Sequence, residues 1–236
     1  ITAADAVTIN MNGNNANAFT LTGLTALAGP VAITMAGDNT NAFYVFSGAN
    51  VTVSNAITAN MMGNNATAFQ IHDGTAIAGP VDITMAGNNT NGFSVDSHLT
   101  VADVTIDITG DNAHGLSVNG GNITAQGSTT LHMNGQNSSG LSTNSGAISI
   151  VGPLSITTSG DNSNALNTND GDISVSGFAT LQTTGENSFG AVANANNGST
   201  QINFERGANI TTTGSSHGII ALLQGNITSS GPFTVN

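Results

Sequence analysis

Short segments in which apolar and polar residues alternate recur along the whole chain. Clear examples read VTINMNG at residues 7–13, VAITMAG at 31–37, VDITMAG at 81–87 and VTIDITG at 104–110. Alternation with a period of two is typical of a β-strand that buries one face. The segments close on glycines that lie 23 to 29 residues apart, at Gly13, Gly37, Gly63, Gly87, Gly110, Gly135, Gly160, Gly185 and Gly214. This spacing predicts about nine repeats of about 25 residues.

Each repeat contains three alternating stretches, and alignment of the repeats places the apolar residues of each stretch in columns that we expect to face the interior. The first stretch contributes two columns, which are Val7, Val31, Ile57, Val81, Val104 and Leu154, and then Ile9, Ile33, Ile83, Ile106, Leu131, Ile156, Leu181 and Ile210. The second stretch contributes Phe19, Phe43, Phe69, Phe93, Leu116, Leu141, Leu166 and Ile219. The third stretch contributes Leu27, Val53, Ile77, Val101, Ile150, Val175 and Phe204.

Three apolar faces per repeat predict an all-β coil closed around one axis. A hairpin meander is the alternative, but it would scatter like residues over different faces and ends, whereas a parallel coil keeps them stacked. Parallel crossovers are right-handed in nearly all cases. We therefore predict a right-handed, single-stranded parallel β-helix (a solenoid) of triangular section, with about nine turns of about 25 residues and three short strands per turn.

The repeat pattern runs from one end of the chain to the other, so residues 1–236 are expected to form one β-helix domain. The pattern starts and stops in the middle of a repeat, and no capping segment is recognisable at either end. Because an open turn of a solenoid exposes core and unpaired strand edges, we expect a fragment of a longer solenoid, or copies that stack end to end.

Two further columns accompany the strands. An asparagine stands two residues after nearly every repeat glycine, at Asn15, Asn39, Asn65, Asn89, Asn112, Asn137, Asn162 and Asn187. These residues could form a row of ligand-binding amides, but a structural ladder is favoured, because asparagine tolerates a left-handed turn and stacked amides bond to one another. Met11, Met35, Met61, Met85 and Met133 fall in one column and are expected to be a packed core stack.

Charge excludes several partners. Only 6% of residues are charged, the net charge is −12, and Arg206 is the single basic side chain apart from histidine. Neutralisation of phosphates by lysine and arginine is therefore not available, and we expect no nucleic-acid partner. No apolar run approaches the roughly 20 residues of a membrane span, so we expect no membrane insertion by this segment. The chain has no cysteine, and no cofactor or metal is predicted.

Four residues are weak catalytic candidates. Asp82 and Asp107 occupy outward columns of neighbouring repeats, with an offset of two residues that suits the separation of an inverting glycosidase pair. His72 and Asp96 share an outward column, but a histidine–carboxylate pair alone lacks a nucleophile or a third metal ligand. Scattered surface residues are the favoured interpretation of both pairs, so we expect no enzyme, with glycoside hydrolase or lyase activity left open.

Segments such as TGDNAHGLSVNGGNITAQG, TSGDNSNALNTNDGDISVSG and TTTGSSHGIIALLQGNITSSG resemble the passenger domains of bacterial autotransporters of the pertactin-like and AIDA-like kind. The resemblance extends over the whole chain as a style of repeat. It implies a right-handed β-helix exported by a Gram-negative bacterium to the cell surface or secreted, with a role in adhesion, aggregation or biofilm. The matching positions are structural, so the resemblance carries over no catalytic residues.

Together, these observations predict a non-enzymatic, surface-exposed passenger or adhesin that binds glycans or proteins on host or bacterial surfaces. A structural subunit that stacks end to end into a fibre is the first alternative. A carbohydrate-active β-helix enzyme is the second, because the fold is shared with polysaccharide lyases and glycosidases.

Overall fold

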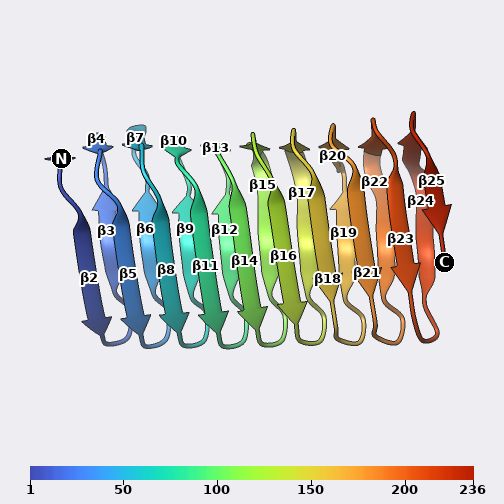
Figure 1. Cartoon of the computed structure of the whole chain (residues 1–236), viewed down its shortest axis with the longest axis horizontal. Helices are drawn as coiled ribbons and strands as arrows, with labels where there is room; N and C mark the ends of the chain where they lie inside the picture. Colours follow the sequence, from blue (N-terminus) through green and yellow to red (C-terminus); the bar gives the residue numbers. More distant parts are fainter.

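The computed structural model describes residues 1–196 and 199–236. The chain is a parallel β-solenoid of about 9 turns of about 25 residues, and the described part contains no helix. In Figure 1 the strands in front run downward and those behind run upward while the coil advances from the N-terminus on the left to the C-terminus on the right, which makes it right-handed. The fold class predicted from the sequence is confirmed.

The strands that open each turn form one sheet of ten parallel strands. In order they are β2 (Val7–Asn12), β5 (Val31–Ala36), β8 (Ile57–Met62), β11 (Val81–Ala86), β14 (Val104–Thr109), β16 (Thr129–Asn134), β18 (Leu154–Thr158), β21 (Ala179–Thr183), β23 (Ala208–Thr212) and β25 (Phe233–Val235). We call these the first strands.

The other strands form a second sheet of fifteen. The second strands of the turns are β3 (Asn17–Leu21), β6 (Asn41–Val45), β9 (Thr67–Ile71), β12 (Asn91–Val95) and β19 (Asn164–Asn169). The third strands are β1 (Thr2–Ala3), β4 (Leu24–Leu27), β7 (Ala49–Val53), β10 (Gly74–Ala78), β13 (His98–Val101) and β20 (Gly171–Val175). In four turns the second and third strands are continuous, as β15 (His114–Ala125), β17 (Ser139–Ile150), β22 (Phe189–Phe204) and β24 (His217–Ser229).

The continuous strands depart from the expected three separate strands per turn. At these corners the backbone goes on pairing through the bend, as Asn119 does with Ser145 of the next turn. In β15 and β17 glycine makes the corner possible, because Gly120 and Gly146 have φ of 103° and 86°, which residues other than glycine rarely adopt. In β24 Leu223 has a φ of 56°. The coil therefore has three apolar faces, but two hydrogen-bonded sheets.

Equivalent residues lie directly opposite one another from turn to turn. Val7 pairs with Val31, Ile9 with Ile33 and Met11 with Met35, and the same register continues through the ten first strands. The interior columns are buried except in the first and last turns, where they are half-buried. Phe19, Phe43, Phe69 and Phe93 form a stack with ring centroids 4.9, 4.6 and 4.9 Å apart. Burial of these columns supplies the main stabilisation of the coil.

One residue of the predicted core is placed wrongly. Ile77 is 46% exposed on β10, whereas Ala76 and Ala78 on either side are buried. The register pairs Ala78 with Val53 and Val101, so the interior position belongs to alanine. Since side chains alternate along a strand, a shift of one residue moves a side chain to the opposite face. The prediction assigned the inward position to the larger side chain, Ile77, although the alternation assigns it to the alanines on either side.

The connections between the first and second strands, at the bottom of Figure 1, depend on glycine and asparagine for different reasons. A Cβ on Gly110, whose φ is 150°, would collide with the carbonyl oxygen of Gly87 in the turn before. The eight asparagines of the predicted ladder all have φ between 51° and 57°, the left-handed conformation that asparagine tolerates best after glycine. Their backbone N–H groups donate to the next turn, as Asn15 does to the carbonyl of Asp38 at 2.9 Å.

The side chains that bond from turn to turn at this edge belong to the residue before each asparagine. The Asp38 carboxylate accepts the backbone N–H of Asn64 at 2.8 Å, and the Asn64 side-chain oxygen accepts the N–H of Asn88 at 2.9 Å. In the same way, the Asp111 carboxylate accepts the backbone N–H of Gln136. This edge therefore carries a ladder of side-chain oxygens that is satisfied by backbone N–H groups and serves the fold.

Candidate functional site

The outer face of the first strands holds Asp82 and Asp107. Both side chains are exposed, and the register places Asp82 opposite Thr105 and Asp107 opposite Thr84. The two carboxylates are therefore offset by two residues on neighbouring strands, about 8 Å apart at their α-carbons. They lie on an open face among threonines, which gives no enclosure for a reacting sugar.

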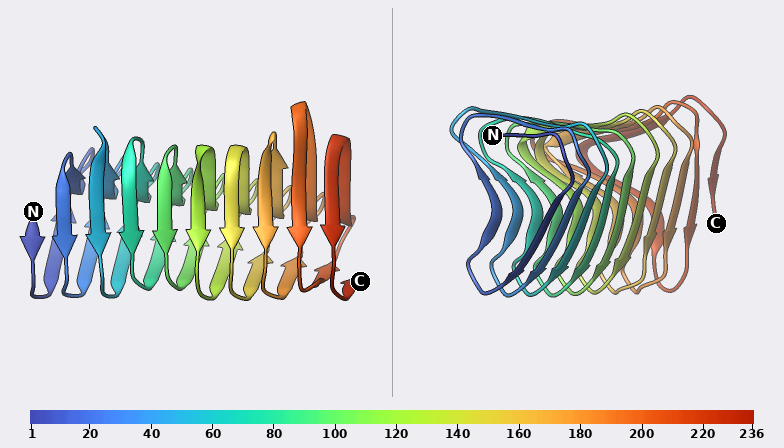
Figure 2. Two further views of the ribbon diagram at one scale, coloured as in Figure 1. Left: turned by 90° about the horizontal axis from the view of Figure 1, so that it is seen from above. Right: turned by 60° about the vertical axis from the view of Figure 1, so that its left-hand side comes forward.

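The outer face of the second strands is less open. In the N-terminal turns the outward residues of the first strands, such as Thr84 on β11, are exposed, whereas Gln70 on β9 and Ser94 on β12 are half-buried although they also point outward. Ser142, in the same column on β17, is only 9% exposed. The right-hand view of Figure 2 shows this side of the coil bowing toward the axis.

We call this column the recessed strip. Its members lie opposite one another on successive turns and end in hydroxyl, phenol or amide groups: Tyr44, Gln70, Ser94, Ser117, Ser142 and Asn167.

Aromatic rings mark one end of the recessed strip. Tyr44, the one tyrosine of the chain, packs against Phe46 with ring centroids 5.1 Å apart and meets the edge of the His72 ring at 5.5 Å. Phe46 and His72 lie just beyond the ends of β6 and β9, where their N–H groups continue the ladder to the turn before. Both Tyr44 and Phe46 are half-buried, so each ring is partly held and partly presented to solvent.

A hydrogen-bonded chain adjoins these rings. His72 Nδ1 lies 2.7 Å from Asp96 Oδ2, and His72 Nε2 lies 3.0 Å from Gln70 Nε2. Because the carboxylate can only accept, Nδ1 carries the proton, and Nε2 then accepts from the Gln70 amide in the neutral ring. The His72 and Asp96 side chains are 42% and 33% exposed.

This arrangement is suited to binding more than to catalysis. Both ring nitrogens of His72 are engaged, so neither is free to take a proton from a substrate. The carboxylate of Asp96 binds His72 through Oδ2, and its side chain is partly exposed. The cluster offers a ring face, a carboxylate oxygen and an amide within one half-buried patch, a combination that orients a polar ligand.

The structure brings together two of the four candidates singled out in the sequence, His72 and Asp96. It leaves Asp82 and Asp107 on a different face of the coil. Sequence reasoning missed Tyr44, Phe46 and Gln70. A usable signal existed, because Tyr44 sits between two buried residues of an alternating strand and must point outward, and outward tyrosines are enriched at binding hot spots.

His114 lies outside this cluster, at the start of β15. Its Nδ1 atom is buried without a hydrogen-bond partner, and burial lowers the pKa of the imidazole because the charged form is poorly solvated there. Its neighbours in the column are Asn91 and Ser139. His114 is a half-buried residue of this column.

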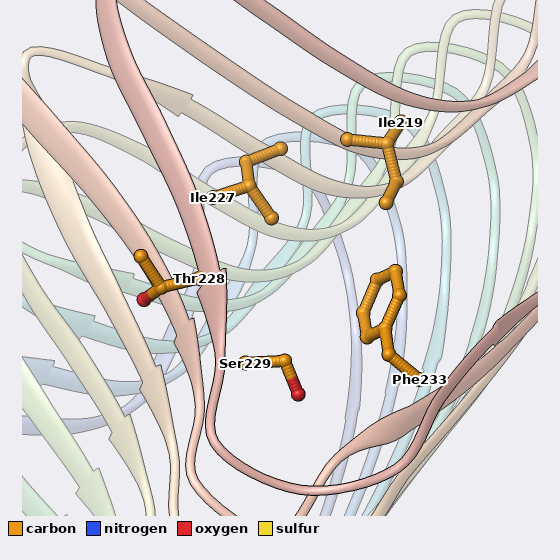
Figure 3. Close-up of a pocket in the computed structure, with 5 residues that line it drawn as sticks. All are labelled: Ile219, Ile227, Thr228, Ser229 and Phe233. Carbon is orange, nitrogen blue, oxygen red and sulfur yellow. The ribbon is translucent and has the colours of Figure 1, made fainter.

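A hollow at the last turn is apolar. Figure 3 shows the side chains of Ile219, Ile227 and Phe233 directed into it from β24 and β25. The register makes these residues continuations of interior columns, since Ile219 pairs with Ala191 and Ile227 with Ile202. The hollow is thus the interior of the coil seen at its last turn.

Within residues 1–196 and 199–236, no three histidine, cysteine, aspartate or glutamate side chains are grouped so that they could hold a metal ion. The same part of the chain has no helix that is long and apolar enough to cross a bilayer.

No protein-family profile, no curated protein and no solved structure matches the chain significantly. The fold therefore defines the class as a parallel β-solenoid, and function has to be inferred from the residues of the coil.

Proposed function

We propose that the chain is the surface-exposed passenger part of an exported bacterial protein of the autotransporter kind, and that it acts by binding. The coil serves as a rigid stalk, and the cluster of Tyr44, Phe46, Gln70, His72 and Asp96 at the recessed strip is its contact site. Resemblance of the repeats to such passenger domains supports the cell-surface or secreted location.

One observation carries this proposal. Most columns of the coil have a structural purpose: apolar residues fill the interior, and the turns are closed by glycine, asparagine and a ladder of side-chain oxygens. The cluster around Tyr44 differs, because its rings and polar groups are gathered on one recessed face and add little to the interior. Half-buried aromatic side chains next to polar groups are the composition of binding hot spots.

The test is binding of the purified chain to intact bacterial and epithelial cells, measured by flow cytometry with a fluorescent label. The native chain should bind saturably, and the double variant Tyr44→Ala, Phe46→Ala should lose most of that binding. Phe178→Ala is the matched control, because Phe178 is 43% exposed but lies outside the cluster. Equal binding by the double variant and the native chain would overturn the proposal. Antibody labelling of intact cells of the producing organism tests the location separately.

The two alternatives predicted from the sequence make different demands. A fibre subunit would give particles much longer than one chain in electron micrographs of the purified protein. A carbohydrate-active enzyme would release reducing ends or unsaturated products from a glycan panel, and that activity would have to fall in Asp82→Asn or Asp107→Asn.

A further inference from the structure

We infer that the recessed strip binds a neutral, extended oligosaccharide, with one sugar ring packed on Tyr44 and its hydroxyl groups held by Asp96 and Gln70. This inference rests on the proposed function and names the class of ligand that the contact site takes.

The ring of Tyr44 supplies the apolar contact. A pyranose ring has a face made of C–H groups, which packs well on an aromatic ring, and tyrosine combines a large apolar surface with few rotatable bonds. Phe46 at 5.1 Å and His72 at 5.5 Å restrict the Tyr44 ring from two sides. Because the ring is already held, little side-chain entropy is lost when a sugar packs on it.

The polar groups of the cluster match the edge of such a sugar. Asp96 Oδ2 lies 2.7 Å from His72 Nδ1, and the carboxylate has a second oxygen that can accept from a hydroxyl group. Hydrogen bonds to a carboxylate are stronger than those between neutral groups. Gln70 provides a planar amide directly opposite Tyr44 on the next turn. Because the His72 ring lies between the two groups, one sugar hydroxyl at the carboxylate and a second at the amide would fix the orientation of the sugar.

The dimensions of the strip favour an extended ligand that lies along the coil axis. Turns repeat about every 4.8 Å, close to the length of one pyranose unit in an extended chain, so successive sugars can meet equivalent side chains. Beyond the cluster the strip continues with hydroxyl and amide groups at Ser94, Ser117, Ser142 and Asn167. The side chains of this column are half-buried, and the backbone of this face bows toward the axis (Figure 2), so a narrow chain can lie along it.

Charge selects a neutral sugar over an acidic one. The chain carries a net charge of −12, and its one arginine, Arg206, lies at the end of β22 and outside the cluster. Asp96 and the neighbouring Asp73 would repel the carboxylates of uronic or sialic acids. A peptide is a weaker fit, because the backbone of the second strands is already paired on both sides and offers no free edge for strand addition.

Tyr44 also gives a direct experiment, because the chain contains one tyrosine and no tryptophan, so tyrosine emission reports on the cluster alone. Cellohexaose and mannohexaose are titrated into the native chain as neutral probes, and hexagalacturonate as the acidic probe, with calorimetry in parallel. At least one neutral hexasaccharide should change the emission saturably, and hexagalacturonate should bind at least about tenfold more weakly at low salt. The variants Phe46→Ala and Asp96→Asn should each weaken neutral binding by about tenfold, whereas Phe178→Ala should leave it unchanged.

If neither neutral probe binds saturably by either method, or if Phe178→Ala loses as much binding as Phe46→Ala, the inference is overturned. Cells treated with periodate, which oxidises glycans, and cells treated with protease separate this inference from the proposed function. Binding lost with periodate supports the oligosaccharide. Binding that is lost with protease, resists periodate and still depends on Tyr44 and Phe46 would assign the strip to a protein partner and leave the proposed function standing.

Discussion

In the first four turns the interior holds a stack of four phenylalanines beside a column of methionines. From β15 onward the positions equivalent to phenylalanine hold leucine, alanine or isoleucine. From β18 onward the positions equivalent to methionine hold threonine, as at Thr158 and Thr183. The residue just before each second strand changes as well. It is Ala66 or Thr90 in the N-terminal turns and serine in each of the later turns, at Ser138, Ser163, Ser188 and Ser216. Yet the register and the length of the turns stay nearly the same.

The serine column is a hydrogen-bonded ladder. Ser163 Oγ donates to the carbonyl of Gly135 at 2.8 Å and accepts the backbone N–H of Ser138 at 3.1 Å, and Ser188 repeats both bonds one turn later. The comparison teaches that one coil geometry accepts two kinds of interior. The N-terminal turns depend on buried apolar area, whereas the C-terminal turns depend on polar groups that must each find a partner.

The largest effect is expected in the phenylalanine stack. Phe69→Ala removes a ring that is stacked on both sides and buried, so the free energy of unfolding should fall by about 4 kcal/mol. Leu166→Ala, at the equivalent position of the C-terminal turns, should cost about 3 kcal/mol. Urea unfolding followed by circular dichroism measures both. A smaller loss for Phe69→Ala than for Leu166→Ala would contradict the greater dependence of the first turns on apolar area.

The next effect concerns the serine ladder. Ser163→Ala removes an acceptor and leaves the buried N–H of Ser138 without its partner, so the free energy of unfolding should fall by about 2 kcal/mol. Ala66→Ser is the reciprocal change in the N-terminal turns, where alanine occupies the same column. It places a hydroxyl between Thr40 and Thr90, whose own hydroxyls bond to the carbonyls of Gly37 and Gly87, so it should change the free energy of unfolding by less than Ser163→Ala does. A neutral Ser163→Ala variant would show that the ladder contributes nothing.

His114 lies at the start of β15, between the turns with phenylalanine and the turns with serine, and it should make stability depend on pH. Burial lowers the pKa of this imidazole, so its contribution is fully present above the unfolded value of about 6.5 and is lost as pH falls below it. His114→Asn, which copies Asn91 in the same column, should therefore lose less stability between pH 7 and pH 5 than the native chain. Thermal unfolding at both values measures the difference, and equal losses would be inconsistent with a buried imidazole.

The smallest effect has the opposite sign. The Thr183 hydroxyl is buried without a hydrogen-bond partner, and valine has nearly the same shape. Thr183→Val should raise the free energy of unfolding by about 1 kcal/mol. Denaturant unfolding of Thr183→Val and Ser163→Ala compares the removal of a hydroxyl without a partner with the removal of one that is hydrogen-bonded. If Thr183→Val destabilises as much as Ser163→Ala, the threonine hydroxyl has a partner in solution.

The sequence was sufficient for the coil because the fold repeats one local rule. Alternation located the strands, and the spacing of the glycines located the turns. The sequence alone therefore predicted that Phe19, Phe43 and Phe69 lie on top of one another. Ile77 shows the limit of this reasoning: hydrophobicity alone cannot fix the phase of a strand when alanine is the buried residue.

The candidate site was harder to predict, since it depends on the curvature of the coil. Sequence columns placed His72 beside Asp96, because both follow the end of a second strand. They could not show that this face is recessed, since burial of an outward side chain depends on how far neighbouring turns project. Nor could they show that Gln70 and Tyr44 lean toward His72, because side-chain rotamers are chosen by packing.

The most direct test of the account uses the lack of cysteine in the chain. Thr34 lies opposite Asn60, and Asn60 lies opposite Thr84, all exposed on the first strands. The pair Thr34→Cys, Asn60→Cys should close an intramolecular disulfide under mild oxidation, since adjacent parallel strands are about 4.8 Å apart and within disulfide reach. The pair Thr34→Cys, Thr84→Cys, two turns and about 10 Å apart, should stay reduced. Closure of the second pair as readily as the first, or failure of the first, would contradict the stacking of equivalent residues on which the coil and its recessed strip depend.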